Sequence, residues 1–132
     1  MPYLLDTNTC IGVMRAHARI VQRLAAVGPG DCAISTITTY ELYTGIEKCA
    51  NPARERGKVE RLLSLVQQLC FGVDAAKEAG RVRAVLESQG QTIGPYDILL
   101  AGHALAAALT LVTANTKEFN RVPGLTVENW QL

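Results

Sequence analysis

Residues 3–10, YLLDTNTC, begin with a short apolar run that ends abruptly in three small polar residues, Asp6, Thr7 and Asn8. The apolar run predicts a short buried β-strand over residues 3–5. All three polar side chains accept hydrogen bonds from the free N–H groups at the start of a helix, so Asp6 has an ordinary use as a helix cap. The other strands of the chain indicate whether Asp6 has a second use.

Apolar, β-prone runs recur along the chain and alternate with longer segments of helical periodicity. The expected strands are residues 3–5, 32–35, 70–73 and 110–113, with 125–127 as a weaker fifth. Apolar positions with helical spacing are Val59, Leu62, Leu63, Val66 and Leu69, and then Ala75, Ala79, Val82 and Leu86. This alternation predicts an α/β fold in which helices cover both faces of a parallel or mostly parallel sheet.

Cap-forming residues and prolines mark the expected helix starts. These are Thr7 or Asn8, Ser35, Asp74 and Tyr96, with Pro52 and Pro95 in first helical turns. Basic residues recur every four positions at Arg15, Arg19 and Arg23, which predicts one helical stripe. The mixed charges of residues 54–61 indicate a solvated helix face. The alternative is that these basic residues and the three arginines together contact phosphate groups.

With 132 residues, the chain has the length of a single domain, and we expect residues 1–132 to form one. No segment approaches the roughly 20 apolar residues of a membrane-spanning helix. The N-terminus lacks the pattern of a secretion signal, so a cytoplasmic protein is expected. A net charge of +1 excludes a globally cationic surface. Nucleic-acid binding would therefore depend on local basic clusters or on metal ions.

Cysteines and histidines do not form a metal-binding pattern. The cysteines are Cys10, Cys32, Cys49 and Cys70, and the histidines are His17 and His103. This spacing matches no zinc site. We expect buried reduced thiols, and packing or surface roles for the histidines.

Aspartates occur at only four positions, and their contexts differ. Asp31 lies in an expected turn, and Asp74 precedes a helix as a cap, so each has a structural use. Asp6 ends a buried strand, and Asp97 leads into an apolar helix. Because ligands bind beyond the carboxyl ends of the strands in open α/β sheets, we expect Asp6 and Asp97 to converge there.

Glu41 is the third acid of interest, within STITTYELYTGIEK, residues 35–48. Thr38 and Glu41 have the spacing of a capping box, which would make Glu41 a structural residue. Its neighbours one turn away are Ile37 and Gly45, so Glu41 does not lie on a charged helix face. Gly45 leaves room for another group to approach.

Carboxylates gathered at one sheet edge repel each other and raise their own pKa values unless a cation lies between them. Oxygen ligands from Asp and Glu suit Mg²⁺ or Mn²⁺ rather than zinc. A site of this kind activates water for in-line attack on a phosphodiester. Spacing alone leaves this use and the structural uses of the acids open.

Four motifs in order resemble those of PIN-domain ribonucleases, and more closely those of the VapC toxins of bacterial type II toxin–antitoxin pairs. The motifs are LLDTNTC (4–10), ISTITTYELYTGIEK (34–48), GPYDILLAGHA (94–104) and LVTANTKEF (111–119). The resemblance covers nearly the whole chain. It implies a three-layer α/β/α sandwich with a mostly parallel central sheet and an acidic pocket that holds Mg²⁺, with Mn²⁺ as a substitute.

The resemblance also implies roles for individual residues. Asp6 and Asp97 correspond to the principal metal ligands, and Glu41 to an acid that binds the metal through water or holds the attacking water. The side chains that would orient these acids are Thr7, Asn8 and Thr113. Many PIN domains have a further aspartate where this chain has Asn115, and Glu118 follows one turn later. Either Glu118 supplies the missing charge or three acids suffice.

The activity that the resemblance implies is metal-dependent endoribonuclease cleavage of structured RNA, with tRNA anticodon loops a frequent target in the family. It further implies a small VapB-like antitoxin whose tail covers the groove near Glu41, and a homodimer. Three alternatives remain. A phosphorylation receiver needs paired acids after its first strand, and a dehalogenase-type phosphatase needs an acid where this chain has Asn8. A catalytically silent PIN module, used for binding only, is the third.

Overall fold

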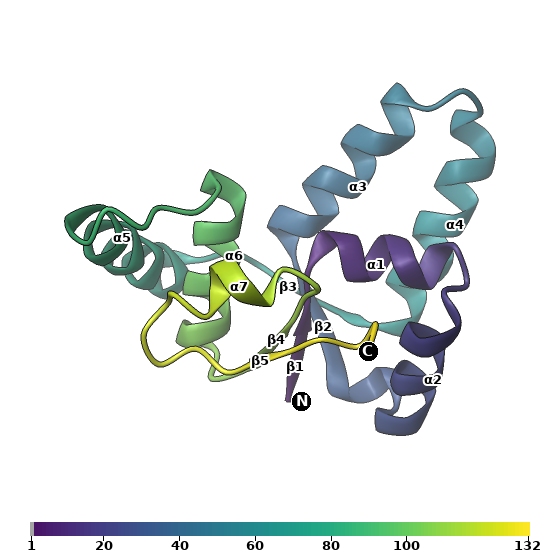
Figure 1. Ribbon diagram of the computed structural model, residues 1–132. Coiled ribbons are helices and arrows are strands. Elements are labelled where there is room, and N and C mark those ends of the chain that lie inside the picture. The colour runs from purple at the N-terminus through teal and green to yellow at the C-terminus, as the bar shows by residue number, and fades with distance from the viewer. Residues whose placement is uncertain (1) are drawn as a thin grey trace.

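The computed structural model describes residues 2–132 and contains a five-stranded parallel sheet with the strand order β3-β2-β1-β4-β5 (Figure 1). The strands are β1 (Tyr3–Leu5), β2 (Cys32–Ser35), β3 (Gln67–Leu69), β4 (Thr110–Val112) and β5 (Val127–Glu128). The helices are α1 (Thr7–Met14), α2 (Ala18–Val27), α3 (Thr36–Lys48), α4 (Pro52–Leu65), α5 (Val73–Ser88), α6 (Pro95–Ala106) and α7 (Thr116–Phe119), with a 3₁₀ turn at Pro29–Asp31.

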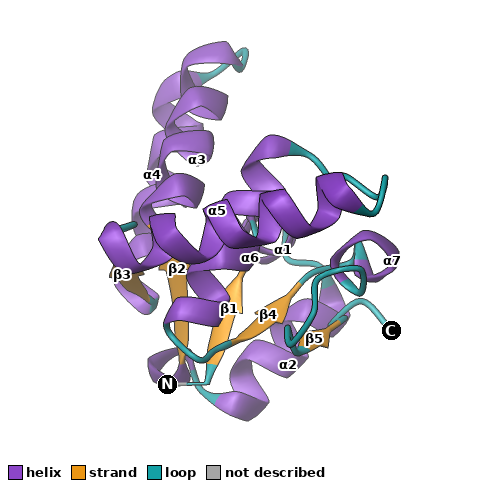
Figure 2. Cartoon of the chain, turned by 90° about the vertical axis from the view of Figure 1, so that its left-hand side faces the viewer, coloured by secondary structure: helices purple, strands orange, loops and turns teal. Residues whose placement is uncertain are grey.

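Side chains alternate between the two faces of the sheet, and each face has its own apolar core. Leu4 and Leu111 belong to the core under α5 and α6, which lie over the strands in Figure 2. Leu5, Ile34 and Val112 belong to the opposite core, with buried residues of α1, α2, α3 and α4. This confirms the expected three-layer α/β/α arrangement, with a sheet that is parallel throughout. Burial on both faces explains why the central strands read as continuous apolar runs.

The chain order places a switch point between β1 and β4. From β1 the chain adds β2 and then β3 on one side, and it returns to β1 on the other side with β4 and β5. Crevices beyond the carboxyl ends of strands form at such points. Asp6 directly follows β1 and Thr113 directly follows β4.

The third strand differs from the expected residues 70–73. It lies at Gln67–Leu69, and α4 ends at Leu65 rather than continuing to residue 69. As an edge strand it exposes Gln67 and Gln68, so its sequence lacks the apolar run that marks the other strands. The prediction of residues 70–73 was therefore wrong, because their apolar residue types resemble a strand, although Cys70 is exposed and Val73 already begins α5.

Of the expected helix starts, Asp74 was wrong and Ser35 is confirmed. Helix α5 begins at Val73 after Gly72, so Asp74 lies inside the first turn and does not cap the helix. Helix α3 begins at Thr36, and its cap is Ser35, whose Oγ accepts a hydrogen bond from Ile37 N at 3.1 Å. The expected prolines Pro52 and Pro95 do occupy first turns.

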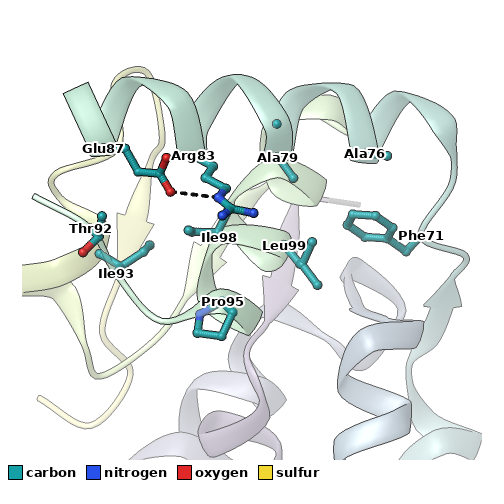
Figure 3. Close-up of a pocket in the computed structure, with 11 residues that line it drawn as sticks. Phe71, Ala76, Ala79, Arg83, Glu87, Thr92, Ile93, Pro95, Ile98 and Leu99 are labelled. Atoms are coloured by element: carbon teal, nitrogen blue, oxygen red, sulfur yellow. Dashed lines mark hydrogen bonds and ion pairs between the residues drawn. The ribbon is translucent and has the colours of Figure 1, made fainter. Parts of the chain in front are cut away.

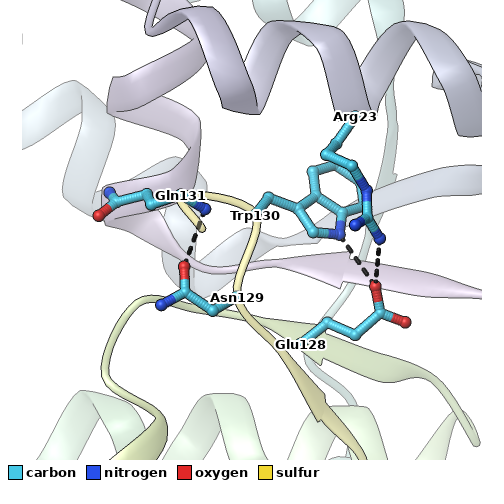
Figure 4. Close-up of polar contacts among 5 residues, drawn as sticks. All are labelled: Arg23, Glu128, Asn129, Trp130 and Gln131. Atoms are coloured by element: carbon cyan, nitrogen blue, oxygen red, sulfur yellow. Dashed lines mark hydrogen bonds and ion pairs between the residues drawn. The ribbon is translucent and has the colours of Figure 1, made fainter.

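The C-terminal segment packs against α2 and the N-terminal strand (Figure 4). Glu128 Oε1 accepts hydrogen bonds from Arg23 at 2.8 Å and from Trp130 Nε1 at 3.1 Å. The buried Trp130 ring meets Tyr3 edge to face, with centroids 5.3 Å apart. The predicted arginine stripe was wrong, because Arg15 follows the end of α1 while Arg23 belongs to α2 and pairs with Glu128.

The cysteines are unpaired across residues 2–132, as expected for reduced thiols. Cys10 and Cys32 are buried, Cys49 is half-buried, and Cys70 is exposed, which corrects the expectation that all four are buried. Within the described part of the chain, no helix has the length and apolar character needed to cross a membrane.

Candidate active site

Asp6 caps a helix and lies where the two central strands of the sheet end. Its Oδ1 accepts a hydrogen bond from Thr9 N at 2.8 Å and so caps α1. Its backbone N–H donates to Val112 O at 3.0 Å, which fixes Asp6 between the ends of β1 and β4. The side chain is only 6% exposed. The cap engages Oδ1 and leaves Oδ2 for a second contact.

Thr9 is a site residue that sequence reasoning missed. Its Oγ1 donates to Val112 O at 3.1 Å, so the same carbonyl of β4 accepts bonds from Asp6 N and from the Thr9 side chain. This pair holds the start of α1 against β4 and fixes the position of the Asp6 carboxylate. The partner is 103 residues away in sequence, so no local pattern predicts it.

Glu41 projects from the second turn of α3 toward the start of α1. Its Oε1 accepts a hydrogen bond from Thr7 Oγ1 at 2.6 Å, and Thr7 also approaches Thr38 Oγ1 at 3.3 Å. The capping box of Thr38 and Glu41 was wrong, because the cap of α3 is Ser35, three residues before Thr38. Thr7 therefore orients Glu41, and its neighbour in the chain is Asp6.

Asp97 lies in the first turn of α6 and responds to the charges of three other acids. Burial is the main reason that its pKa rises from 3.8 to about 6. The negative charges of Glu118, Asp6 and Glu41 raise this pKa further, in that order. Because like charges raise a pKa most at short range, this pattern indicates that the four carboxylates lie near one edge of the sheet.

Gly94 gives the Asp97 carboxylate room. A Cβ at this position would lie 3.3 Å from Asp97 Oδ2, tighter than an ordinary van der Waals contact. Gly94 of the GPYD motif therefore leaves the space that the Asp97 carboxylate occupies.

The remaining predicted residues lie around β4 and α7. Thr113 is fully buried, and its Oγ1 accepts a hydrogen bond from Asn115 N at 3.0 Å, which shapes the turn that leads to Glu118. Asn8 and Asn115 are exposed. Among residues 2–132, no hydrogen bond joins the side chain of Asn8 or Asn115 to one of the four acids. The charge of Glu118 therefore acts on Asp97, whereas the two exposed amides make no hydrogen bond to the four acids within the described chain.

The donor set consists of carboxylate oxygens, which fit a hard divalent cation. No three acidic, histidine or cysteine side chains of the described chain form a ready metal cage. Mg²⁺ keeps several waters and needs only one or two carboxylates, so the acids fit this ion without a closed cage. The histidines lie elsewhere, since His17 caps α2 and His103 is buried in α6, where burial lowers its pKa.

Glu41 borders two hollows. One, of about 170 Å³, has apolar walls that include Ile11, Met14 and Leu42. The other, of about 260 Å³, is lined by Tyr40, Thr44, Lys48 and Tyr96 besides Glu41.

A larger hollow of about 480 Å³ lies between α5 and α6 (Figure 3). Its only acid is Glu87, which accepts a hydrogen bond from Arg83 at 2.9 Å. That hollow therefore lacks free carboxylates, and the acidic edge remains the candidate active site.

The PIN domain family matches residues 3–125 of this chain. A tRNA(fMet)-specific endonuclease VapC from Shigella flexneri is 38% identical over 130 residues, with 98% of each chain covered. Ribonuclease VapC2 from Rickettsia felis is 36% identical over 132 residues, also with 98% of each chain covered.

Solved structures agree with this assignment. VapBC2 from Rickettsia felis, bound to a DNA fragment from its promoter, contains a chain that superposes with a TM-score of 0.93 at 36% identity, covering 98% of this chain and 99% of that one. FitAcB from Neisseria gonorrhoeae gives a TM-score of 0.86 at 28% identity, with the same coverage. This chain therefore belongs to the PIN-domain family and, within it, to the VapC group.

Proposed function

We propose that this chain is the toxin of a toxin–antitoxin pair and acts as a metal-dependent endoribonuclease on structured RNA, with tRNA as the leading substrate class. The observation that carries the proposal is the convergence of Asp6, Glu41, Asp97 and Glu118 at the edge where β1 and β4 end. The names of the relatives, which include a tRNA(fMet)-specific endonuclease, support RNA as the substrate.

Asp6 and Asp97 would hold the metal, which we propose is Mg²⁺, with Mn²⁺ as a substitute. When bound, such an ion stabilises the charge that develops during attack on a phosphodiester and lowers the pKa of water. Thr7 fixes one oxygen of Glu41, and the other oxygen would accept a hydrogen bond from the attacking water. Glu118 adds a fourth negative charge beside Asp97. Thr9 and Thr113 keep the surrounding turns in place.

The apolar hollow beside Glu41 suits the tail of an antitoxin. Ile11, Met14 and Leu42 offer an apolar surface, and Glu41 offers a partner for a basic side chain. The similar solved structures include VapBC complexes, which supports a VapB-like partner. We further propose a homodimer that acts in the cytoplasm, where such RNA occurs.

A catalytically silent PIN module is the competing function. It predicts loss of at least one acid from the site, whereas all of Asp6, Glu41 and Asp97 are present and their charges interact. The match to the PIN domain family excludes the receiver and phosphatase alternatives.

Expression in a bacterial host tests the proposal. The wild-type chain should arrest growth and leave discrete cleavage products of tRNA, and a short reading frame beside its gene should restore growth. Asp6→Asn should abolish growth arrest and tRNA cleavage, because an asparagine still caps α1 but brings no charge to the site. Circular dichroism checks that the variant folds. Growth arrest by Asp6→Asn equal to that of wild type would contradict the proposed site.

A further inference from the structure

Two exposed tyrosines form a pair directly beside the acids. Tyr40 precedes Glu41 on α3, and Tyr96 precedes Asp97 at the start of α6. Their hydroxyls are 3.0 Å apart, and their ring centroids are 5.7 Å apart at an angle of 53°. The rings are nevertheless open to solvent, since Tyr40 is 54% and Tyr96 42% exposed. Exposed aromatic rings that hold each other in place form a rigid surface for a planar ligand.

A basic side chain lies at the same surface. Tyr40, Thr44 and Lys48 recur at four-residue spacing along α3 and line one wall of the hollow of about 260 Å³, with Tyr96 and Glu41 completing it. Lys48 is exposed, and within the described chain it forms no ion pair. The hollow thus offers aromatic rings, a cation and a carboxylate of the proposed active site within one surface.

We propose that the Tyr40–Tyr96 pair stacks an unpaired base of the RNA substrate next to the cleaved phosphodiester, and that Lys48 contacts a neighbouring phosphate. This inference rests on the proposed function and deepens it, because it assigns a substrate-positioning role to residues outside the acid cluster. Proteins that bind single-stranded nucleic acid combine aromatic stacking with basic contacts to the backbone. The surface selects RNA with an unpaired loop, since bases inside a duplex present no free face for stacking.

The lining of the tyrosine hollow matches RNA better than a protein tail. The hollow of Ile11, Met14 and Leu42, on the other side of Glu41, combines apolar walls with the charged side chains Arg15 and Glu55, which suit an amphipathic tail. The tyrosine hollow instead has polar hydroxyls and a lysine, which match a base edge and a phosphate.

Binding to a fluorescein-labelled hairpin RNA with an unpaired loop tests the inference in EDTA, and gel analysis afterwards verifies that the RNA is intact. The double variant Tyr40→Leu with Tyr96→Leu should raise Kd about tenfold or more, because it keeps apolar bulk but removes both ring faces. The double variant Tyr40→Phe with Tyr96→Phe keeps both rings and should bind within about twofold of wild type. Lys48→Gln should raise Kd and reduce its salt dependence.

Tyr43→Leu is the matched control, because Tyr43 lies on the same helix and is 40% exposed but does not line this hollow. Its Kd should equal that of wild type, and the fully paired stem without a loop should bind wild type and the tyrosine variants equally. An unchanged Kd for the double leucine variant would overturn the inference. So would a loss confined to binding of the antitoxin, which would make the surface a protein contact. If the wild-type chain neither binds nor cleaves RNA, the proposed function itself fails.

Discussion

The ionisation of Asp97 depends strongly on its surroundings. Its pKa rises from 3.8 to about 6, first because of burial and then because of Glu118, Asp6 and Glu41. Between about pH 3.8 and pH 6, Asp97 therefore binds a proton more tightly in the folded state than in the unfolded state. The free energy of unfolding falls as the pH rises through this window, and the cost of the charged carboxylate is fully present above about pH 6.

Asp97→Asn should therefore stabilise the metal-free protein at neutral pH, by roughly 1–3 kcal/mol, because it removes a repelled charge. Urea denaturation in EDTA at pH 7.5 measures this gain, and the same comparison near pH 3.5 should show little difference. Added Mg²⁺ should stabilise wild type more than the variant, because the variant lacks a ligand charge. Equal stability of the two proteins at both pH values would contradict the repulsion among the four acids.

Glu118 is expected to supply the charge that Asn115 lacks. Its charge is the largest electrostatic contribution to the raised pKa of Asp97, and the Asn115 amide makes no hydrogen bond to the acids of the described chain. Glu118→Gln should raise the Mg²⁺ concentration needed for half-maximal RNA cleavage, and Asn115→Asp should lower it. Metal titrations of cleavage compare the variants, and Lys117→Gln in the same helix is the control. If the titration curves of Glu118→Gln and Asn115→Asp both coincide with that of wild type, Glu118 has no role in the site.

Among single residues, the positions of the acids could be predicted from the sequence, whereas Thr7 was expected only from the resemblance and Thr9 was missed. Asp6 and Asp97 stand at the ends of apolar elements, and this position is visible in the sequence. The hydrogen bonds of Thr9 to β4 and of Thr7 to Glu41 join segments more than 30 residues apart. They follow from the packing of α1 and α3 onto the sheet, which no local pattern encodes.

At the scale of elements, burial decided which predictions were right. Strands β1 and β2 lie at the predicted residues because both faces of the central strands are covered. Strand β3 could not be recognised, since an edge strand with exposed glutamines has no apolar run. The arginine stripe was wrong for a related reason. The spacing was helical, but Ala16 has a φ of 57°, and this left-handed backbone separates α1 from α2.

The contact between α5 and α6 gives the prediction that belongs to this scale. A Cβ at Gly102 would lie 2.5 Å from Ala79 Cα and 2.6 Å from Ala79 Cβ, so the two helices approach too closely for any side chain there. Gly102→Ala should therefore lower the free energy of unfolding by about 1–3 kcal/mol. Chemical denaturation measures the change.

Gly80→Ala, within α5, is the matched control, because a Cβ at that position meets nothing within 4 Å. It should raise the free energy of unfolding by about 0.5–1 kcal/mol, since alanine is the better helix former. A Gly102→Ala protein as stable as wild type would show that the helices separate easily and that their close packing is unimportant.

At the scale of the whole molecule, the strand order brings together acids that are far apart in sequence. The return of the chain from β3 to the other side of β1 places the end of β4 beside the end of β1. Alternating strands and helices predicted a parallel sheet, but not this order. The resemblance to PIN domains added the three-layer sandwich, which the structure confirms, and the family match confirms the family. That residues 1–132 act as one domain stays a prediction.

The central claim is that the four-acid edge uses a divalent metal and water to cleave RNA, and the chemistry of the product ends tests it most directly. Purified protein is incubated with total tRNA in Mg²⁺ or in EDTA, and the new ends are mapped by ligation to adaptors. We expect cleavage in Mg²⁺ only, with 5′-phosphate and 3′-hydroxyl ends, because water rather than the ribose 2′-hydroxyl attacks the phosphorus. Full cleavage in EDTA, or 2′,3′-cyclic phosphate ends, would contradict the account.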